Sequence, residues 1–155
     1  MFTPTTQAAG TNSAKLEAYV YRPELIPLVW GEMENVLEKC FEKTAGILSA
    51  EQVYQWLIEG TAIAFATVKE NRLEAVLIVT KVNYAKYSIA RIVACGGMNL
   101  KGAMQFIDAL EAWAFTHGCV EIEAWCETPV ARLVRRYGWK SKLTIVSRDL
   151  RRKLQ

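Results

Sequence analysis

The chain has 155 residues, of which 52% are hydrophobic and 23% charged, with a net charge of +3. These values are ordinary for one globular domain with a substantial core. No apolar run reaches the roughly 18 to 20 residues that span a bilayer, and residues 1–13 lack the basic start and apolar middle of a signal peptide. The four cysteines form no CxxC pair and there is one histidine, so the sequence predicts no metal site.

The first part of the chain predicts an arm, a strand and two helices. Residues 1–13 show no apolar period and predict a flexible arm, and Leu16–Tyr21 predicts a short strand. Apolar residues recur at helical spacing over Pro23–Lys43. Ser49 and Gln52 form a capping box, which predicts the start of a second, shorter helix.

The rest of the chain predicts five strands and two helices. Three strands come first, at Ala62–Lys69, Leu73–Lys81 and Ser88–Cys95. A helix, a strand, a short helix and a closing strand follow, at Leu100–Thr116, Cys119–Trp125, Pro129–Tyr137 and Lys142–Arg148. The order is β-α-α-β-β-β-α-β-α-β, an α/β (α+β) fold with a mixed sheet. We expect one domain over residues 14–150 and a basic tail over residues 151–155.

The C-terminal end of the chain is basic. Nine basic residues stand between Arg132 and Lys153 against a single acid, Asp149. Such an end can bind nucleic acid without sequence preference, and the candidate side chains are Arg132, Arg135, Arg136, Arg151 and Arg152. A solvated face with a charged tail is the simpler interpretation.

A glycine pair stands where a predicted strand meets a predicted helix. Gly96 and Gly97 follow the strand that ends at Cys95, and the helix begins at Leu100. Backbone N–H groups at such a turn, together with the helix dipole, can hold an anion. The alternative is a turn that needs glycine for a positive φ.

The element order resembles the GNAT family of acyltransferases over residues 14–150, and Tyr137-Gly138-Trp139 is similar to the family's aromatic-glycine-aromatic sequence. In that family two strands splay apart, acetyl-coenzyme A enters between them, and its pyrophosphate binds a loop of pattern (Gln/Arg)-x-x-Gly-x-(Gly/Ala). The loop of this chain has no arginine or glutamine at the matching position. The resemblance implies the coenzyme-binding residues Gly96, Gly97, Lys101, Gly102 and Ala103.

A narrower resemblance, over residues 90–150, is to small bacteriophage proteins with a GNAT-like fold. The matching segments are Cys95-Gly96-Gly97, Leu110-Glu111-Ala112-Trp113-Ala114, Gly118-Cys119-Val120-Glu121-Ile122-Glu123 and Tyr137-Gly138-Trp139. This resemblance implies a head-assembly or internal-virion protein without a cofactor, with phage structural proteins as partners. It also implies a location in the bacterial host cytoplasm or in the virion.

The alternative is an acetyl-coenzyme A-dependent N-acetyltransferase that acts on an amine. Glu121 is then the candidate general base, and the resemblance implies Tyr137 as the acid that reprotonates the leaving thiolate. By the period of two, Glu121, Glu123 and Cys119 share one face of their strand. A solvated row of glutamates and a packed tyrosine are the simpler interpretations, so the sequence leaves the enzyme question open.

Overall fold

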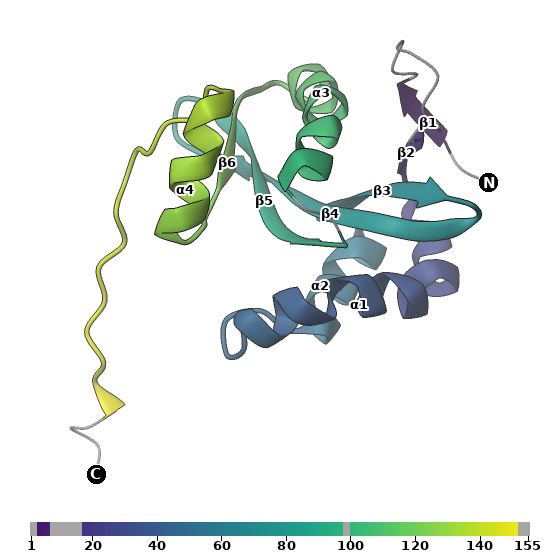
Figure 1. Cartoon of the computed structure of the whole chain (residues 1–155), viewed down its shortest axis with the longest axis horizontal. Coiled ribbons are helices and arrows are strands. Elements are labelled where there is room, and N and C mark those ends of the chain that lie inside the picture. The colour runs from purple at the N-terminus through teal and green to yellow at the C-terminus, as the bar shows by residue number, and fades with distance from the viewer. Residues whose placement is uncertain (1–2, 7–16, 98–99, 152–155) are drawn as a thin grey trace. The chain divides into compact units, whose positions relative to one another are not determined.

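The strands of the chain form a mixed sheet, shown with its helices in the computed structural model of Figure 1. The structure describes residues 3–6, 17–97 and 100–151. It divides into two compact units, one up to Ala124 and one from Trp125 onward. Among the described residues, no helix has both the length and the apolar character that a membrane crossing needs.

The first unit holds the whole sheet. Its strands are β1 (Thr3–Thr6), β2 (Glu17–Val20), β3 (Ala62–Lys69), β4 (Arg72–Asn83), β5 (Ser88–Gly96) and β6 (Cys119–Ala124). They lie side by side in chain order, each antiparallel to the next except for the parallel pair β5–β6. The mixed sheet predicted from the element order is therefore confirmed.

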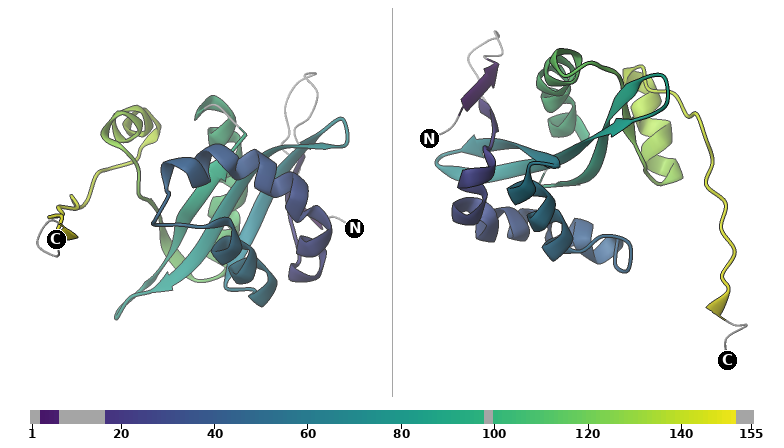
Figure 2. Two further views of the ribbon diagram at one scale, coloured as in Figure 1. Left: turned by 90° about the horizontal axis from the view of Figure 1, so that it is seen from below. Right: turned by 180° about the vertical axis from the view of Figure 1, so that it is seen from behind.

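Helices cover both faces of this sheet (Figures 1 and 2). They are the short 3-10 helix η1 (Pro23–Leu25), α1 (Ile26–Lys43), α2 (Ala50–Glu59) and α3 (Leu100–Thr116). Helices α1 and α2 pack on one face, where Met33, Leu37 and Leu57 are buried against alternate residues of β3 and β4. Helix α3 packs on the other face through Phe106 and Leu110. Successive strand residues point to opposite faces of the sheet, so the apolar residues of the strands form two separate cores, one under each helical layer.

The segment expected to be a flexible arm contains a strand. Residues 3–6 form β1, which pairs antiparallel with β2, and the other residues of that segment are outside the described part of the chain. Strand β2 is shorter than the predicted strand Leu16–Tyr21, and its register places Val20 opposite Phe65 of β3.

The second unit holds α4 (Thr128–Val134) and the 3-10 helix η2 (Arg135–Tyr137). Gly138 ends η2 with a φ of 87°, the left-handed conformation that glycine adopts readily. The structure has no strand at the predicted Lys142–Arg148, since residues 139–150 have no regular secondary structure. A β-strand needs a neighbour to satisfy its backbone groups, and an alternating apolar pattern does not supply one.

Candidate active site

Strand β5 carries a bulge at Val93. Its pairing with β4 shifts there, because Ile92 lies opposite Val79 whereas Ala94 lies opposite Ile78. Val93 is the extra residue, and a bulge bends a strand and re-aims the backbone groups beside it. Ile92 packs on the α3 side of the sheet, and Val93 and Ala94 both pack on the α1 side.

Strand β6 ends at Ala124, directly before this bulge in β5. The parallel register runs from Ser88 opposite Cys119 to Ile92 opposite Ala124. Beyond that point the residues of β5 have register partners on β4 alone among the described strands. The parted edge, Val93–Gly96, is therefore an edge to which an extended ligand can add hydrogen bonds.

A polar cluster lies one residue before the pairing of β5 with β6 ends. Nε of Arg91 donates a hydrogen bond to Oε1 of Glu123 at 2.8 Å across the parallel register. Nη2 of Arg91 donates to Oη of Tyr84 at 3.0 Å, and that hydroxyl donates to Oε2 of Glu123 at 3.3 Å. The two charged side chains are only 23% and 26% exposed, so less solvent screens their attraction than at an open surface.

No pattern in the sequence predicted this cluster. Its three members come from the turn after β4, from β5 and from β6, so no local spacing links them. The signal available in the sequence was an arginine and a glutamate on two strands expected to run in parallel. Their pairing depends on a register that the sequence pattern does not fix.

A second bulge sets the direction of the glutamates on β6. Cys119 lies opposite Ser88 and Glu121 lies opposite Ile89, so Val120 is an extra residue. Cys119 and Ile122 consequently pack together against the α3 side, and Glu121 shares the opposite face with the Arg91 partner Glu123. The prediction that Cys119 lies on the face of Glu121 was wrong, because a bulge inverts the alternation.

Gly96 and Gly97 have a packing reason for being glycine. A Cβ atom on Gly96 would overlap the carbonyl oxygen of Val36 in α1, and one on Gly97 would overlap the carbonyl oxygen of Glu74. Gly97 also has a φ of +79°, as the turn interpretation expects. The end of β5 thus packs directly against the backbone of α1 and β4. Anion binding at this turn stays a prediction.

The remaining predicted coenzyme residues begin α3. Lys101, Gly102 and Ala103 lie in its first turns, and the loop residues Met98 and Asn99 are outside the described residues. The helix N-terminus therefore follows the turn closely, as the prediction of anion binding requires. Their role in binding a coenzyme stays a prediction.

The other predicted side chains belong to the second unit. Tyr137 ends η2 with a side chain that is 52% exposed, and its role as an acid stays a prediction. Arg132, Arg135 and Arg136 belong to α4 and η2. Arg151 pairs with Asp149 at 2.7 Å, and its guanidinium lowers the pKa of that carboxyl. Arg152 lies outside the described residues.

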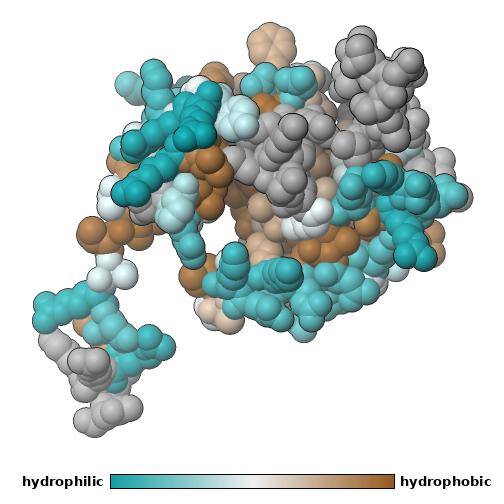
Figure 3. Space-filling view, viewed as in Figure 1, coloured by the Kyte–Doolittle hydropathy of each residue, from teal (hydrophilic) through white to brown (hydrophobic). Residues whose placement is uncertain are grey.

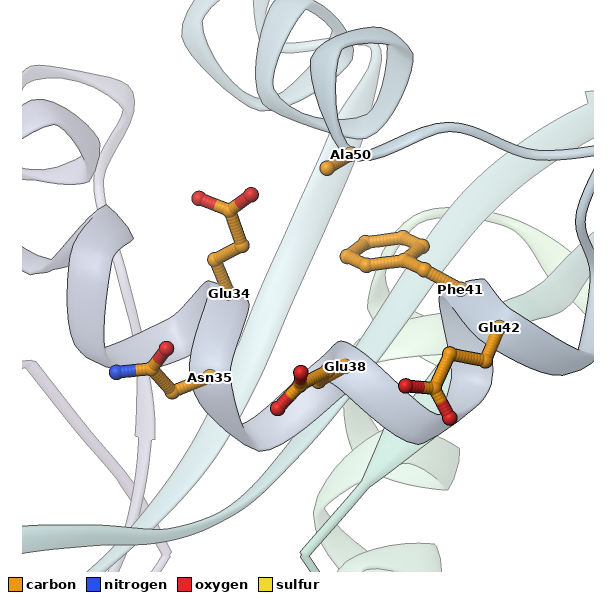
Figure 4. Close-up of a pocket in the computed structure, with 6 residues that line it drawn as sticks. All are labelled: Glu34, Asn35, Glu38, Phe41, Glu42 and Ala50. Carbon is orange, nitrogen blue, oxygen red and sulfur yellow. The ribbon is translucent and has the colours of Figure 1, made fainter.

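An open depression of about 400 Å³ lies over α1 and the start of α2 (Figure 4). Glu34, Glu38 and Glu42 line it at four-residue intervals, beside Phe41. Like charges at this spacing destabilise a helix slightly. None of the residues predicted for the site lines it, and the described residues contain no group of three or more metal-ligating side chains.

Comparison with solved structures identifies the fold. An aminoglycoside acetyltransferase from an uncultured soil metagenomic sample matches with a TM-score of 0.64 at 14% identity, over 88% of this chain and 99% of that chain. A predicted acetyltransferase from Clostridium acetobutylicum, solved with acetyl-coenzyme A, matches with a TM-score of 0.64 at 10% identity, over 87% and 96%. An aminoglycoside N-acetyltransferase in complex with coenzyme A matches with a TM-score of 0.61 at 12% identity, over 92% and 99%.

The chain therefore has the GNAT acetyltransferase fold, as its element order predicted. No protein-family model matches the sequence, and no curated protein matches it. At these identities the likeness shows the fold, and the activity has to be argued from the site.

Proposed function

We propose that the chain transfers an acetyl group from acetyl-coenzyme A to an amine. The observation that carries the proposal is the end of the β5–β6 pairing at Ile92 and Ala124, directly beside the bulge at Val93. In the reaction the amine nitrogen forms a bond to the acetyl carbon, and the carbon–sulfur bond breaks. A base takes one proton from the amine, and the sulfur takes one proton back.

The residues around the parted edge suit a ligand with an extended amide chain. The backbone of Val93–Gly96 lies at an edge where such a chain can add hydrogen bonds in the manner of a strand. Gly96 and Gly97 lie against the backbone of α1 and β4, which holds in place the backbone N–H groups that we propose for the phosphate contact before α3. Acetyl-coenzyme A would supply an activated acetyl group at this edge, with Lys101, Gly102 and Ala103 nearest to its pyrophosphate.

Polar side chains of β5 and β6 are candidates for binding and deprotonating the amine. Glu121 is exposed and is our candidate for the base. Glu123 is held by Arg91 and Tyr84, and a carboxylate fixed in this way can position an amine by accepting its hydrogen bond. Tyr137 is the candidate for the acid.

The virion role remains without support beyond the sequence resemblance. The solved structures described above are acetyltransferases, and their likeness favours the enzyme over the assembly protein. The incomplete pyrophosphate loop is the remaining argument for a chain that has lost the activity.

Thermal unfolding with and without acetyl-coenzyme A tests the proposal. A ligand that binds only the folded protein stabilises it by about 2.7 kcal/mol at a hundredfold excess over its Kd. We expect the midpoint to rise with acetyl-coenzyme A and with coenzyme A, and to stay constant with ADP at the same concentration. An unchanged midpoint at millimolar acetyl-coenzyme A would contradict the proposal.

A further inference from the structure

Two tyrosines in the turn between β4 and β5 form an aromatic pair. The ring centroids of Tyr84 and Tyr87 lie 5.4 Å apart, edge to face, with an interplanar angle of 76°. The backbone N–H of Tyr84 donates a hydrogen bond to the carbonyl oxygen of Tyr87 at 2.8 Å. Oγ of Ser88 donates to Oδ1 of Asn83 at 2.6 Å. Hydrogen bonds of the backbone and of side chains therefore both hold the turn that carries the two rings.

The hydroxyl group of Tyr84 joins this pair to the Arg91 cluster. Its oxygen accepts a hydrogen bond from Nη2 of Arg91 at 3.0 Å and donates one to Oε2 of Glu123 at 3.3 Å. The ring of Tyr84 is consequently fixed beside the carboxylate of Glu123, with the ring of Tyr87 next to it. Tyr84 is 42% exposed and Tyr87 is 43% exposed, so part of each ring is accessible to a ligand.

The pair lies at the opposite end of β5 from the proposed coenzyme edge. Strand β5 begins at Ser88, directly after the turn, whereas the edge Val93–Gly96 is at its other end. Arg91 and its partner Glu123 lie between the two. An amine at Glu123 would thus have the proposed place of the acetyl donor on one side and the tyrosine pair on the other. The rest of the acceptor molecule would extend over the rings.

The charges of the cluster favour an acceptor with one amine over a polycation. The guanidinium of Arg91 lies 2.8 Å from the carboxylate of Glu123 and balances its charge. A polyamine is better matched by a row of carboxylates, such as Glu34, Glu38 and Glu42 on α1, where the space-filling view shows mainly hydrophilic residues (Figure 3). At the tyrosine pair the ring faces supply the contact instead, and an aromatic ring of a ligand can extend their edge-to-face arrangement.

We propose that Tyr84 and Tyr87 bind the body of the acceptor and select an amine carried on an aromatic ring. The inference rests on the proposed acetyl transfer, because it names the class of acceptor for that reaction. The ring of the acceptor packs against the tyrosine pair, and its amine group reaches the carboxylate of Glu123. Before its proton is removed, the ammonium group is also attracted by the faces of the tyrosine rings.

Isothermal titration calorimetry with two amines tests this selection. Phenethylamine carries an aromatic ring, and hexylamine is a flexible amine of similar apolar size. Both are titrated into the full chain, alone and with coenzyme A, which has no acetyl group to transfer. We expect phenethylamine to bind about tenfold more tightly, as contacts between aromatic rings allow. Tyr87→Ala should lose this preference, whereas Tyr87→Phe, which keeps the ring, should retain it.

Three results decide the inference. Equal or undetectable binding of the two amines by the wild type would overturn it, even if the protein acetylates both. A preference that persists in Tyr87→Ala, at an unchanged far-UV spectrum, would overturn it as well, because the ring of the ligand would then contact another surface. A preference that depends on the ring of Tyr87, without any acetyl transfer, would support the ring site and contradict the proposed function, so the two proposals fail separately.

Discussion

At the scale of single residues, Gly97 shows that a glycine can be required both by packing and by backbone conformation. A Cβ atom there would lie 2.7 Å from Cγ1 of Val36 and would overlap the carbonyl oxygen of Glu74. The backbone also has a φ of +79°, which costs another residue about 1 kcal/mol or more. Both terms act on the folded state, so the site has little tolerance for substitution.

Replacement of Gly97 by alanine should therefore lower the free energy of unfolding by about 3 kcal/mol, since overpacking adds roughly 1 to 3 kcal/mol to the backbone strain. Gly46→Ala is the matched control, because Gly46 has a φ of +84° and nothing within 4 Å of the point that a Cβ atom would occupy. It should lose about 1 kcal/mol. Urea unfolding curves measure both, and equal losses would contradict the packing account.

The two glutamates on β6 have different tasks in the proposed reaction. Glu121→Gln removes the candidate base and should lower kcat/KM by roughly 100-fold, in the range of general base catalysis. Glu38→Gln on the outer face of α1 is the control and should keep full activity. A kcat/KM unchanged in Glu121→Gln would assign the proton transfer to another group.

The ionisation of Tyr21 makes the free energy of unfolding depend on pH. Burial raises its pKa to about 12, with a smaller contribution from the charge of Glu32. The unfolded phenol ionises near pH 10, so between about pH 10 and 12 the unfolded state releases a proton that the folded state keeps. The stability that this group contributes is therefore complete below about pH 10 and falls as the pH rises to about 12.

Tyr21→Phe should remove this part of the alkaline loss. We expect the wild type to lose roughly 2 kcal/mol more than the variant between about pH 10 and 12, from 1.36 kcal/mol for each pKa unit with some screening by solvent. Tyr87→Phe, at an exposed tyrosine, is the control. Parallel curves for the wild type and Tyr21→Phe would contradict the assignment.

At the scale of elements, local signals predicted the helices well. Ser49 caps α2 as expected, since its Oγ accepts a hydrogen bond from the backbone N–H of Gln52 at 3.1 Å. Gly60 ends the helix with a φ of 79°. These signals depend on residues three or four apart, so a sequence displays them directly.

Ser49→Ala should consequently lower the free energy of unfolding by about 1 kcal/mol, the usual loss for an N-cap. Ser147→Ala, in the segment without secondary structure, should change it by less than about 0.5 kcal/mol. Thermal or urea unfolding of the two variants measures the difference. An unchanged stability in Ser49→Ala would mean that packing alone holds the start of α2.

The sheet was predictable in its elements and not in its register. Strands β3, β4 and β5 were expected within a few residues of their observed bounds. The bulges at Val93 and Val120 were not, because each depends on pairing between strands far apart in sequence. The Arg91 cluster and the face of Glu121 follow from those bulges, so the centre of the candidate site could not be predicted from the sequence.

At the scale of the whole molecule, the fold agrees with the predicted GNAT resemblance. Two cores on opposite faces of one sheet hold β5 in place. Among the described strands, β6 is the last of this sheet, and it carries both Glu121 and Glu123 of the candidate active site.

Amine-dependent release of the coenzyme A thiol from acetyl-coenzyme A tests the proposed activity most directly. A thiol reagent follows it continuously, with phenethylamine, polyamines, aminoglycosides and lysine peptides as acceptors. We predict release that saturates with at least one amine, together with a product heavier than that amine by one acetyl group. Release that does not depend on any amine, or none at all while the protein binds acetyl-coenzyme A, would contradict acetyl transfer.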